Sequence, residues 1–534
     1  MPVRPPLIAL ALLVLGTGTA RAYTLEILHF NDFHSRIESI NKYDSTCSGE
    51  DEAAGACFGG AARMLTEIDA RRDAAKAKDE AVLVLNAGDV FQGSLFFTTY
   101  SGKAELDFMN RLGLDAMVVG NHEFDLGPGP LAEFIKGANF PVLFGNATVT
   151  EDPMLGPLAE GPRVLEAGGE KIGIVGAVTP ETATISTPGP TVRFEDPAVT
   201  IARDVAALEG EGVNKIILLS HLGAPEDIRI AGSVAGIDAV IGGHTHTLFS
   251  NSEGAPYPYP LMVDGPGNAK VPVVSAGAYS KYLGDLTLTF DDQGAVTAAG
   301  GDTILLDRSV TPDPGVLKDI KTYSGPIEAL KAKRVGEVGA DIDGSRESCR
   351  ARECAMGDLV ADAMLDRVKG QGVTIALQNG GGLRASIGAG EVSMGEVLAV
   401  LPFQNTLSTF NISGAGIVAA LENGVSEVEE GAGRFPQVAG LRFTWDPAGA
   451  PNGGRIREVL VAEGDGWAPI DRAKVYTVVT NNFMRNGGDG YAVLRDQGDN
   501  AYDYGPNLED VLADYLAARP GYTPPPADRI TRAE

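Results

Sequence analysis

The chain is poor in positive charge, and this shortage excludes a large class of functions. It has 43 Lys and Arg residues against 71 Asp and Glu residues, which gives a formal net charge of −28. Because phosphate backbones are bound by clustered Lys and Arg, we do not expect this protein to bind nucleic acid. Its 534 residues are 44% hydrophobic and 21% charged. That composition also excludes wholesale disorder and a multi-span membrane protein.

Long apolar runs are absent after the N-terminus. Residues 1–22 have the pattern of a secretory signal peptide, with Arg4 before an apolar run over 7–15 and a small-x-small cleavage site at Ala20-Arg21-Ala22. No later run reaches the ~18 residues needed to span a bilayer. We therefore expect a periplasmic or secreted protein that is cleaved after Ala22 and has no stable membrane anchor.

Cysteine is also scarce. The chain has four cysteines, Cys47, Cys57, Cys349 and Cys354, and they form two pairs that are close in sequence. In an oxidising compartment this pattern predicts two local disulfides, Cys47–Cys57 and Cys349–Cys354. A zinc site is the less favoured interpretation, because neither pair has the usual two-residue spacing and no histidine lies nearby.

The order of the apolar runs predicts an α/β protein with two domains. In the first half, strand-like runs alternate with helical stretches, which is typical of layered α/β folds. The predicted strands are 25–30, 81–85, 116–119, 172–175, 215–219 and 239–241, and the predicted helices include 61–78, 104–111, 130–137 and 197–208. A charged, helix-forming stretch over 315–333 follows, and then strands near 373–377, 407–412 and 475–479. We expect an N-terminal domain over 23–311, a helical linker over 312–334 and a C-terminal α/β domain over 335–534.

Metal-capable side chains follow five predicted strands of the first half. Each lies just past the carboxyl end of its strand, where the ligand crevice of a layered α/β fold is found. The residues are Asp32 and His34, Asp89, Asn121 and His122, His221, and His244 and His246. Five of the six histidines of the chain belong to this set. The sixth, His29, lies inside a predicted strand, where a satisfied core histidine is the favoured interpretation.

This set of ligands suits two adjacent divalent cations. Imidazole and carboxylate groups favour zinc, with manganese or cobalt as the other options. Asp89 is the candidate bridge between the ions, because a carboxylate has two oxygens. Two ions a few ångströms apart activate a water and neutralise charge on a phosphoryl group. The sequence therefore predicts a dinuclear hydrolytic centre.

The ordered set resembles the calcineurin-like metallophosphoesterase family over about residues 24–250. The resemblance implies a four-layer α/β/β/α domain and a role for each residue. Asp32, His34, Asp89 and His246 would hold one ion, and Asp89, Asn121, His221 and His244 the other. His122 would be a non-ligand histidine that stabilises the leaving group, and Asp125 would orient its imidazole.

The second half adds motifs suited to a phosphorylated ligand. The glycines of Asn379-Gly380-Gly381-Gly382-Leu383-Arg384 permit close backbone approach, and Arg384 offers a bidentate fork for phosphate. The predicted C-terminal disulfide would close a turn that carries Arg350. Asp489 lies in the glycine-rich run 487–490, which predicts a tight loop with an exposed carboxylate.

Together these motifs resemble the 5'-nucleotidase family, which includes ecto-5'-nucleotidases and periplasmic UDP-sugar hydrolases. By this resemblance Phe403 and Phe483 would sandwich the base, and Asp489 would bind the ribose hydroxyls. Judged alone, each of the two rings is more simply interpreted as a core residue. The other substrate contacts that it implies are Arg346, Arg350, Asn379, Gly382, Arg384 and Asn405. Ala355 departs from the family pattern, in which Asn usually precedes Met-Gly.

The sequence therefore predicts a two-metal 5'-nucleotidase, in which the C-terminal domain holds the nucleoside and the N-terminal domain releases phosphate. The same scaffold acting on UDP-sugars, nucleoside di- or triphosphates or 2',3'-cyclic nucleotides is left open. A non-catalytic nucleotide-binding protein is less favoured, because binding alone does not need His122 and Asp125. The preferred base, the oligomeric state and the extent of domain motion are open as well.

Overall fold

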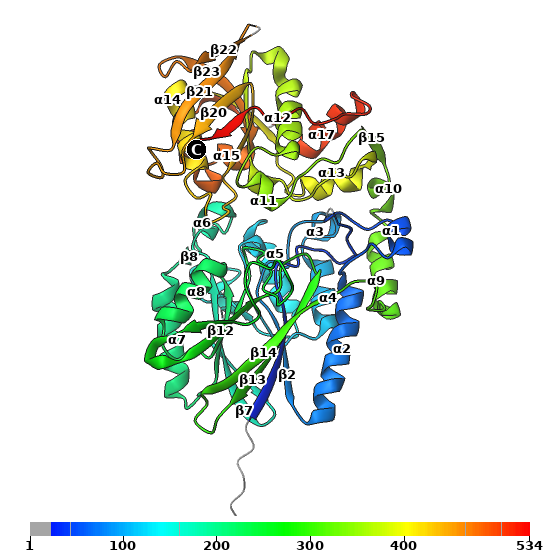
Figure 1. The fold of residues 1–534 in the computed structure, drawn as a ribbon, viewed down its shortest axis with the longest axis vertical. Coiled ribbons are helices and arrows are strands. Elements are labelled where there is room, and N and C mark those ends of the chain that lie inside the picture. Colours follow the sequence, from blue (N-terminus) through cyan, green and yellow to red (C-terminus); the bar gives the residue numbers. More distant parts are fainter. Residues whose placement is uncertain (1–22, 43, 160, 465, 504, 534) are drawn as a thin grey trace, which may run out of the picture.

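The computed structural model describes residues 23–533 apart from positions 43, 160, 465 and 504 (Figure 1). Two layered α/β bodies lie one above the other, with α10 (Glu328–Lys331) at their boundary on one side and α6 (Thr182–Ile185) on the other, while α9 (Pro314–Ser324) lies beside the N-terminal body. The predicted signal peptide, residues 1–22, lies outside the described residues. Within that described part, no helix combines the length and the apolar character needed to cross a membrane.

The N-terminal body is built on two six-stranded sheets, in the orders β14-β13-β1-β2-β3-β4 and β11-β12-β10-β9-β7-β6. The first contains β1 (Tyr23–Phe30), β2 (Ala81–Asn86), β3 (Ala116–Val118), β4 (Val142–Leu143), β13 (Tyr282–Phe290) and β14 (Val296–Leu305). The second contains β6 (Arg163–Ala167), β7 (Glu170–Val178), β9 (Ile216–His221), β10 (Ala239–Gly242), β11 (Leu261–Asp264) and β12 (Lys270–Ser275). The central strands of both sheets are parallel, so their carboxyl ends share one edge.

Alternate residues of β1 enter two different apolar layers, as the two-residue period of a strand requires. Leu25 and Ile27 pack in the core between the sheets, whereas Leu28 and Phe30 pack under α2 (Ala61–Lys78) and α4 (Lys103–Leu112). Helices α7 (Pro197–Gly210) and α8 (Ala224–Ser233) cover the outer face of the second sheet. The predicted α/β/β/α layering is therefore confirmed.

The linker differs from the single helical stretch predicted over 315–333. It is broken into α9 and α10 around Pro326. Proline has no backbone N–H, so Pro326 cannot donate the next hydrogen bond of the helix and the first helix ends before it. The apolar core continues through α9 into the C-terminal body. Val316 and Ile320 of α9 belong to the same buried cluster as Leu359, which lies in the C-terminal body.

The C-terminal body contains a five-stranded mixed sheet and a smaller four-stranded sheet. The larger sheet has the order β19 (Pro436–Ala439), β16 (Ile375–Asn379), β23 (Val475–Asn481), β18 (Leu407–Ser413) and β24 (Asp499–Tyr502). The smaller has the order β22 (Gly466–Pro469), β21 (Ile456–Glu463), β20 (Leu441–Trp445) and β25 (Ile530–Arg532). Helix α12 (Ala355–Val368) packs on one face of the larger sheet, with α17 (Leu508–Ala517) packed against α12, and α14 (Gly414–Gly424) packs on the other face.

Both predicted disulfides are present. Cys47 is bonded to Cys57, and Cys349 is bonded to Cys354. The second bond closes a short loop directly before α12, and that loop carries Arg350 and Arg352.

Candidate metal centre and interdomain cleft

The side chains predicted to bind metal come together at the shared carboxyl edge of the two N-terminal sheets. Asp32 and His34 follow β1, Asp89 follows β2, Asn121 follows β3, His221 ends β9, and His244 and His246 follow β10. Within the described residues they form two groups able to hold an ion, Asp32–His34–His246 and Asp89–His221–His244, each with ligand atoms within 4.8 Å of one another. A third group that meets the same distance limit, His34–Asp89–His122, overlaps both and includes the predicted non-ligand His122. Asn121 joins the second group, because its Oδ1 lies 3.0 Å from His244 Nδ1.

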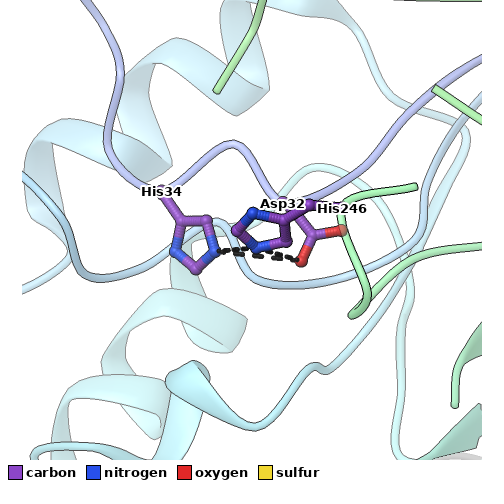
Figure 2. A group of neighbouring side chains, drawn as sticks. All are labelled: Asp32, His34 and His246. Atoms are coloured by element: carbon purple, nitrogen blue, oxygen red, sulfur yellow. Dashed lines mark hydrogen bonds and ion pairs between the residues drawn. The ribbon is translucent and has the colours of Figure 1, made fainter. Parts of the chain in front are cut away.

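In the first group the side chains of Asp32, His34 and His246 lie close together (Figure 2), and an Arg384 guanidinium nitrogen also lies 3.1 Å from His34 Nε2. His34 Nε2 lies 3.0 Å from His246 Nε2, and His246 Nε2 lies 3.2 Å from Asp32 Oδ1. His34 Nδ1 faces the carbonyl oxygens of Phe91 and Gln92, so the ring proton belongs there and the Nε2 lone pair points into the group. Burial and the Arg384 charge hold the pKa of His34 well below its usual value, which keeps this imidazole neutral. A neutral imidazole is the form that binds metal.

The second group is organised around Asp89. His221 donates from Nδ1 to the Ala87 carbonyl at 2.6 Å, and its Nε2 lies 3.1 Å from Asp89 Oδ2. Burial lowers the pKa of His221, but the charge of Asp89 outweighs this effect and raises that pKa to about 10. Asp89 Oδ2 also lies 3.7 Å from His34 Nε2, so this carboxylate faces both groups. That is the position that a bridging ligand requires.

Two observations show that a cation fits this pocket. Asp32 Oδ1 and His221 Nε2 are buried, and the atoms that face them belong to other metal-capable side chains, His246 Nε2 at 3.2 Å and Asp89 Oδ2 at 3.1 Å. Buried polar atoms crowded together in this way suit a cation. The backbone is also strained here, because five of the predicted ligands have left-handed φ values. These are Asp32 (48°), His34 (49°), Asp89 (55°), His244 (74°) and His246 (57°). Strain of this kind clusters at functional sites, where it aims side chains at a common point.

His122 and Asp125 form a close pair at the rim of the metal pocket. His122 Nδ1 lies 2.6 Å from Asp125 Oδ2, and the backbone N–H of His122 donates to Asp89 Oδ1 at 2.9 Å. Although burial opposes it, the charges of Asp125 and Asp89 raise the pKa of His122. The pair can therefore supply a positively charged N–H donor beside the ions.

A cavity of about 1010 Å³ lies between the two bodies and joins these groups to the second half of the chain. On the N-terminal side its wall includes Asp89, Asn121, His122, Asp125, His244 and His246. On the C-terminal side it includes every predicted substrate contact, namely Arg346, Arg350, Asn379, Gly382, Arg384, Phe403, Asn405, Phe483 and Asp489. The tertiary structure thus brings all of these predicted residues to one space.

The rings of Phe403 and Phe483 are half-buried on this wall, and Phe483 also packs against the apolar core of the C-terminal body. Phe403 stacks on the His122 imidazole with ring centroids 5.7 Å apart, and the Arg384 guanidinium lies 5.7 Å from the same ring. The Phe483 ring covers Gly488, where a Cβ atom would come within 2.5 Å of the ring. Only glycine fits under that ring.

Asp489 corrects one expectation, because its carboxylate is buried and not exposed. It is 6% exposed, and burial raises the pKa of its carboxyl group. Asn379 Nδ2 donates to Asp489 Oδ2 at 2.6 Å, and Asn481 Nδ2 donates to Asn379 Oδ1 at 2.9 Å. The glycine-rich run does form a tight turn, but these partners from β16 and β23 draw its side chain inward.

Several residues of this region were missed by sequence reasoning. Glu123 ties the loops after β2 and β3 together, and Ser186 and Gln92 hydrogen-bond to Asp125. Glu123 had a weak signal, since it directly follows His122. Ser186 and Gln92 had none, because their partner is distant in sequence and their own surroundings contain no motif.

Comparisons with known proteins agree with this arrangement. A calcineurin-like phosphoesterase model matches residues 25–248, and a model of the 5'-nucleotidase C-terminal domain matches residues 331–496. The chain is 36% identical to a snake venom 5'-nucleotidase of Naja atra, over 93% of this chain and 96% of that protein. It is 36% identical to a 5'-nucleotidase of Homo sapiens, over 92% and 88%. The crystal structure of a 5'-nucleotidase precursor from Thermus thermophilus superposes with a TM-score of 0.90 at 40% identity, covering 96% of this chain and 99% of that one.

Proposed function

Because this chain belongs to the 5'-nucleotidase family, we propose that it hydrolyses nucleoside 5'-monophosphates to nucleoside and phosphate in the interdomain cleft. The chain is a metal-dependent phosphoesterase. One observation carries the proposal: each of the two groups of metal-capable side chains contributes to the cavity wall, His246 from the first and Asp89 and His244 from the second, and the residues suited to a nucleoside line the same cavity.

The proposed metal site holds two divalent cations. Asp32, His34, Asp89 and His246 would bind one, and Asp89, Asn121, His221 and His244 would bind the other. The nitrogen-rich ligand set favours zinc, with manganese or cobalt as alternatives. When bound, such ions supply a reactive water and neutralise charge on the phosphoryl group.

The protein's own residues would bind and orient the ester. Arg350 and Arg384 are placed to hold phosphate oxygens, since both guanidinium groups line the cavity beside the metal pocket. The Nε2 N–H of His122 would donate to the departing 5'-oxygen, while Asp125 at 2.6 Å fixes the opposite ring nitrogen. The proton on His122 is thus held at the atom where the leaving group needs it.

The remaining predicted contacts would hold the nucleoside. Phe403 and Phe483 offer two aromatic faces for the base, and the buried Asp489 offers a carboxylate to the ribose hydroxyls. Asn379 and Asn405 lie on the same wall and would complete the polar contacts of base and sugar, with Gly382 leaving room for close backbone approach. Arg346 would add charge at the phosphate end.

We propose a periplasmic or secreted location for the mature protein. The pattern of residues 1–22 and the two disulfides support it, because disulfides persist in oxidising compartments. Relatives that carry the name snake venom 5'-nucleotidase are consistent with this location.

The test is phosphate release from AMP, UDP-glucose, ATP and cyclic AMP, each with and without a chelator. Chelator-sensitive hydrolysis that is fastest with AMP is the expected result. Faster turnover of UDP-glucose or ATP would reassign the substrate on the same scaffold. Nucleotide binding without any hydrolysis in the presence of zinc, manganese or cobalt would contradict an enzymatic role.

A further inference from the structure

Residues 179–187, which we name the α6 segment, are anchored at both ends on the catalytic machinery. At its start, the backbone N–H of Thr179 donates to the carbonyl of His221 at 3.0 Å. At its end, the Ser186 hydroxyl donates to Asp125 Oδ1 at 2.7 Å, and the Thr187 hydroxyl donates to the Phe124 carbonyl at 3.0 Å. The segment therefore touches a predicted metal ligand and the predicted acid pair without being part of either.

The middle of the segment contacts the C-terminal body. Helix α6 packs against η6 (Gly488–Gly490), the turn that carries Asp489. Glu181, directly before α6, lies 4.0 Å from the Arg434 guanidinium, and the Arg434 carbonyl accepts from the Tyr491 hydroxyl at 2.6 Å. Figure 1 shows α6 at the boundary of the two bodies, on the side opposite α9 and α10. A long, half-exposed ion pair stabilises little, so the packing of α6 on η6 is the main connection.

Ser186 controls the orientation of the Asp125 carboxylate. Oδ2 of Asp125 faces His122 Nδ1 at 2.6 Å and receives a long bond from Gln92 Nε2 at 3.3 Å. Among the described residues, Ser186 donates the hydrogen bond to Asp125 Oδ1. Removing that hydroxyl leaves Oδ1 without this donor while Oδ2 keeps its contacts with His122 and Gln92, so the carboxylate and the imidazole that faces the leaving group are held less tightly. A small rotation there matters, because proton donors act only over hydrogen-bond distance.

We propose that the α6 segment transmits nucleoside binding at the Asp489 turn to the His122–Asp125 pair, with Ser186 as the positioning residue. The inference rests on the proposed function and adds that the nucleoside raises kcat as well as affinity. Binding energy from a remote part of a substrate accelerates the reaction when it orients the reacting groups. Here the remote part is the ribose and base at η6, and the path is η6, α6, Ser186, Asp125 and His122. A phosphate ester without a nucleoside would bind the same metals and leave this path unused.

The test compares AMP with glycerol phosphate, an alkyl ester that has neither base nor ribose ring. The variants are Ser186→Ala, Ser186→Thr and a matched control, Thr322→Val, whose exposed hydroxyl on α9 donates to the Lys318 carbonyl of its own helix, away from the cavity. We expect Ser186→Ala to lower kcat for AMP about tenfold, with KM and the kcat for glycerol phosphate changed less than about twofold. Ser186→Thr keeps the donor and should restore kcat, and Thr322→Val should match the unsubstituted protein.

Other results overturn the inference in recognisable ways. Equal losses of kcat with both esters would show that Ser186 orients Asp125 whether or not a nucleoside is bound. No loss with AMP would show that Asp125 is oriented without Ser186. Equal kcat for AMP and glycerol phosphate in the unsubstituted protein would show that there is no nucleoside effect to transmit. Failure of the proposed function looks different, because the unsubstituted protein would then release no phosphate from AMP.

Discussion

The Glu123 carboxylate accepts a hydrogen bond from the backbone N–H of Asp89, with 3.0 Å between nitrogen and Oε2. The same oxygen accepts from Gly120 at 2.6 Å, and Oε1 accepts from Val90 at 2.8 Å and from Phe91 at 3.0 Å. One buried side chain thus pins the loop that carries Asp89 to the loop that carries Asn121 and His122. The spacing of the two predicted ion positions depends on this connection.

Glu123→Gln should therefore weaken metal binding while leaving every proposed ligand in place. The amide offers one acceptor oxygen and turns an N–H₂ group toward backbone donors that then have no acceptor. Loss of such a supporting contact typically costs about 10- to 100-fold in metal affinity. Zinc titration would measure the change. Glu133→Gln is the control, because that side chain is 69% exposed on α5 (Pro128–Gly137) and pairs only with Lys136 among the described residues. Identical affinities in the two variants would contradict this role.

Metal removal should abolish hydrolysis, and zinc, manganese or cobalt should restore it. Asp89→Ala should be more damaging than Asp32→Ala, because Asp89 faces both predicted ion positions and Asp32 faces one. Metal analysis beside activity assays would separate the two variants. We expect two ions lost from Asp89→Ala and one from Asp32→Ala. Full activity after exhaustive chelation is incompatible with the proposed metal centre.

His122→Ala should keep both ions and lose turnover. In the proposed arrangement this imidazole donates to the leaving oxygen and binds no metal, and loss of one such donor typically costs on the order of 10²–10³ in rate. Metal content and kcat measured on the same sample give the answer. If one ion is lost with the imidazole, then His122 is a ligand.

Replacing both Phe403 and Phe483 by Ala should separate nucleotides from simple esters. Stacking contributes roughly 1–3 kcal/mol per base, so kcat/KM for AMP should fall about 5- to 150-fold. Hydrolysis of p-nitrophenyl phosphate, which has no base, should change far less. An equal fall for both substrates together with a lower Tm would indicate a misfolded protein. No change with either substrate would place the base elsewhere.

Asp358 should make the protein less stable as the pH rises. Burial, together with the nearby Glu353 and Asp362, raises the pKa of the Asp358 carboxyl group to about 8, although Arg529 opposes the shift. An unfolded Asp has a pKa of about 3.9, so between about pH 4 and 8 the folded state holds a proton that the unfolded state has lost. Stability therefore falls as the pH increases through that window.

The thermal midpoint of Asp358→Asn should fall less between pH 5 and 8 than that of the unsubstituted protein, because the amide has no proton to release. Asp514→Asn is the matched control, since Asp514 is 68% exposed and pairs with Arg367 on the surface. Thermal melts at several pH values would check this. Parallel curves for Asp358→Asn and the unsubstituted protein would contradict the raised pKa.

Much of the fold was predictable because apolar periodicity is a local property. Helix α2 has the bounds predicted for it, 61–78, and each predicted strand coincides with an observed strand apart from a few residues at its ends. The metal-capable set was predictable for a related reason. Its members follow parallel strands, and the carboxyl ends of parallel strands meet at one edge of a sheet.

Residues whose role depends on a partner from another element were not predictable. The predicted exposed carboxylate of Asp489 is buried, because Asn379 at the end of β16 and Asn481 at the end of β23 draw it inward. The sequence pattern predicts a single helical stretch in the linker. Pro326 is the local signal for the break that the structure shows there.

The main strands and helices, the cysteine pairs and the side chains that follow the strands of the N-terminal body were all predictable from the amino-acid order. Hydrophobic period, turn chemistry and short loop closure act between neighbours in the chain, which is why they can be recognised there. The fold was needed to show that Glu123 supports Asp89, that Ser186 hydrogen-bonds to Asp125, and that Phe403 stacks on His122 across the cleft. These contacts depend on the order of strands in each sheet and on how two bodies face one another, and those arrangements follow from burial of the whole apolar surface.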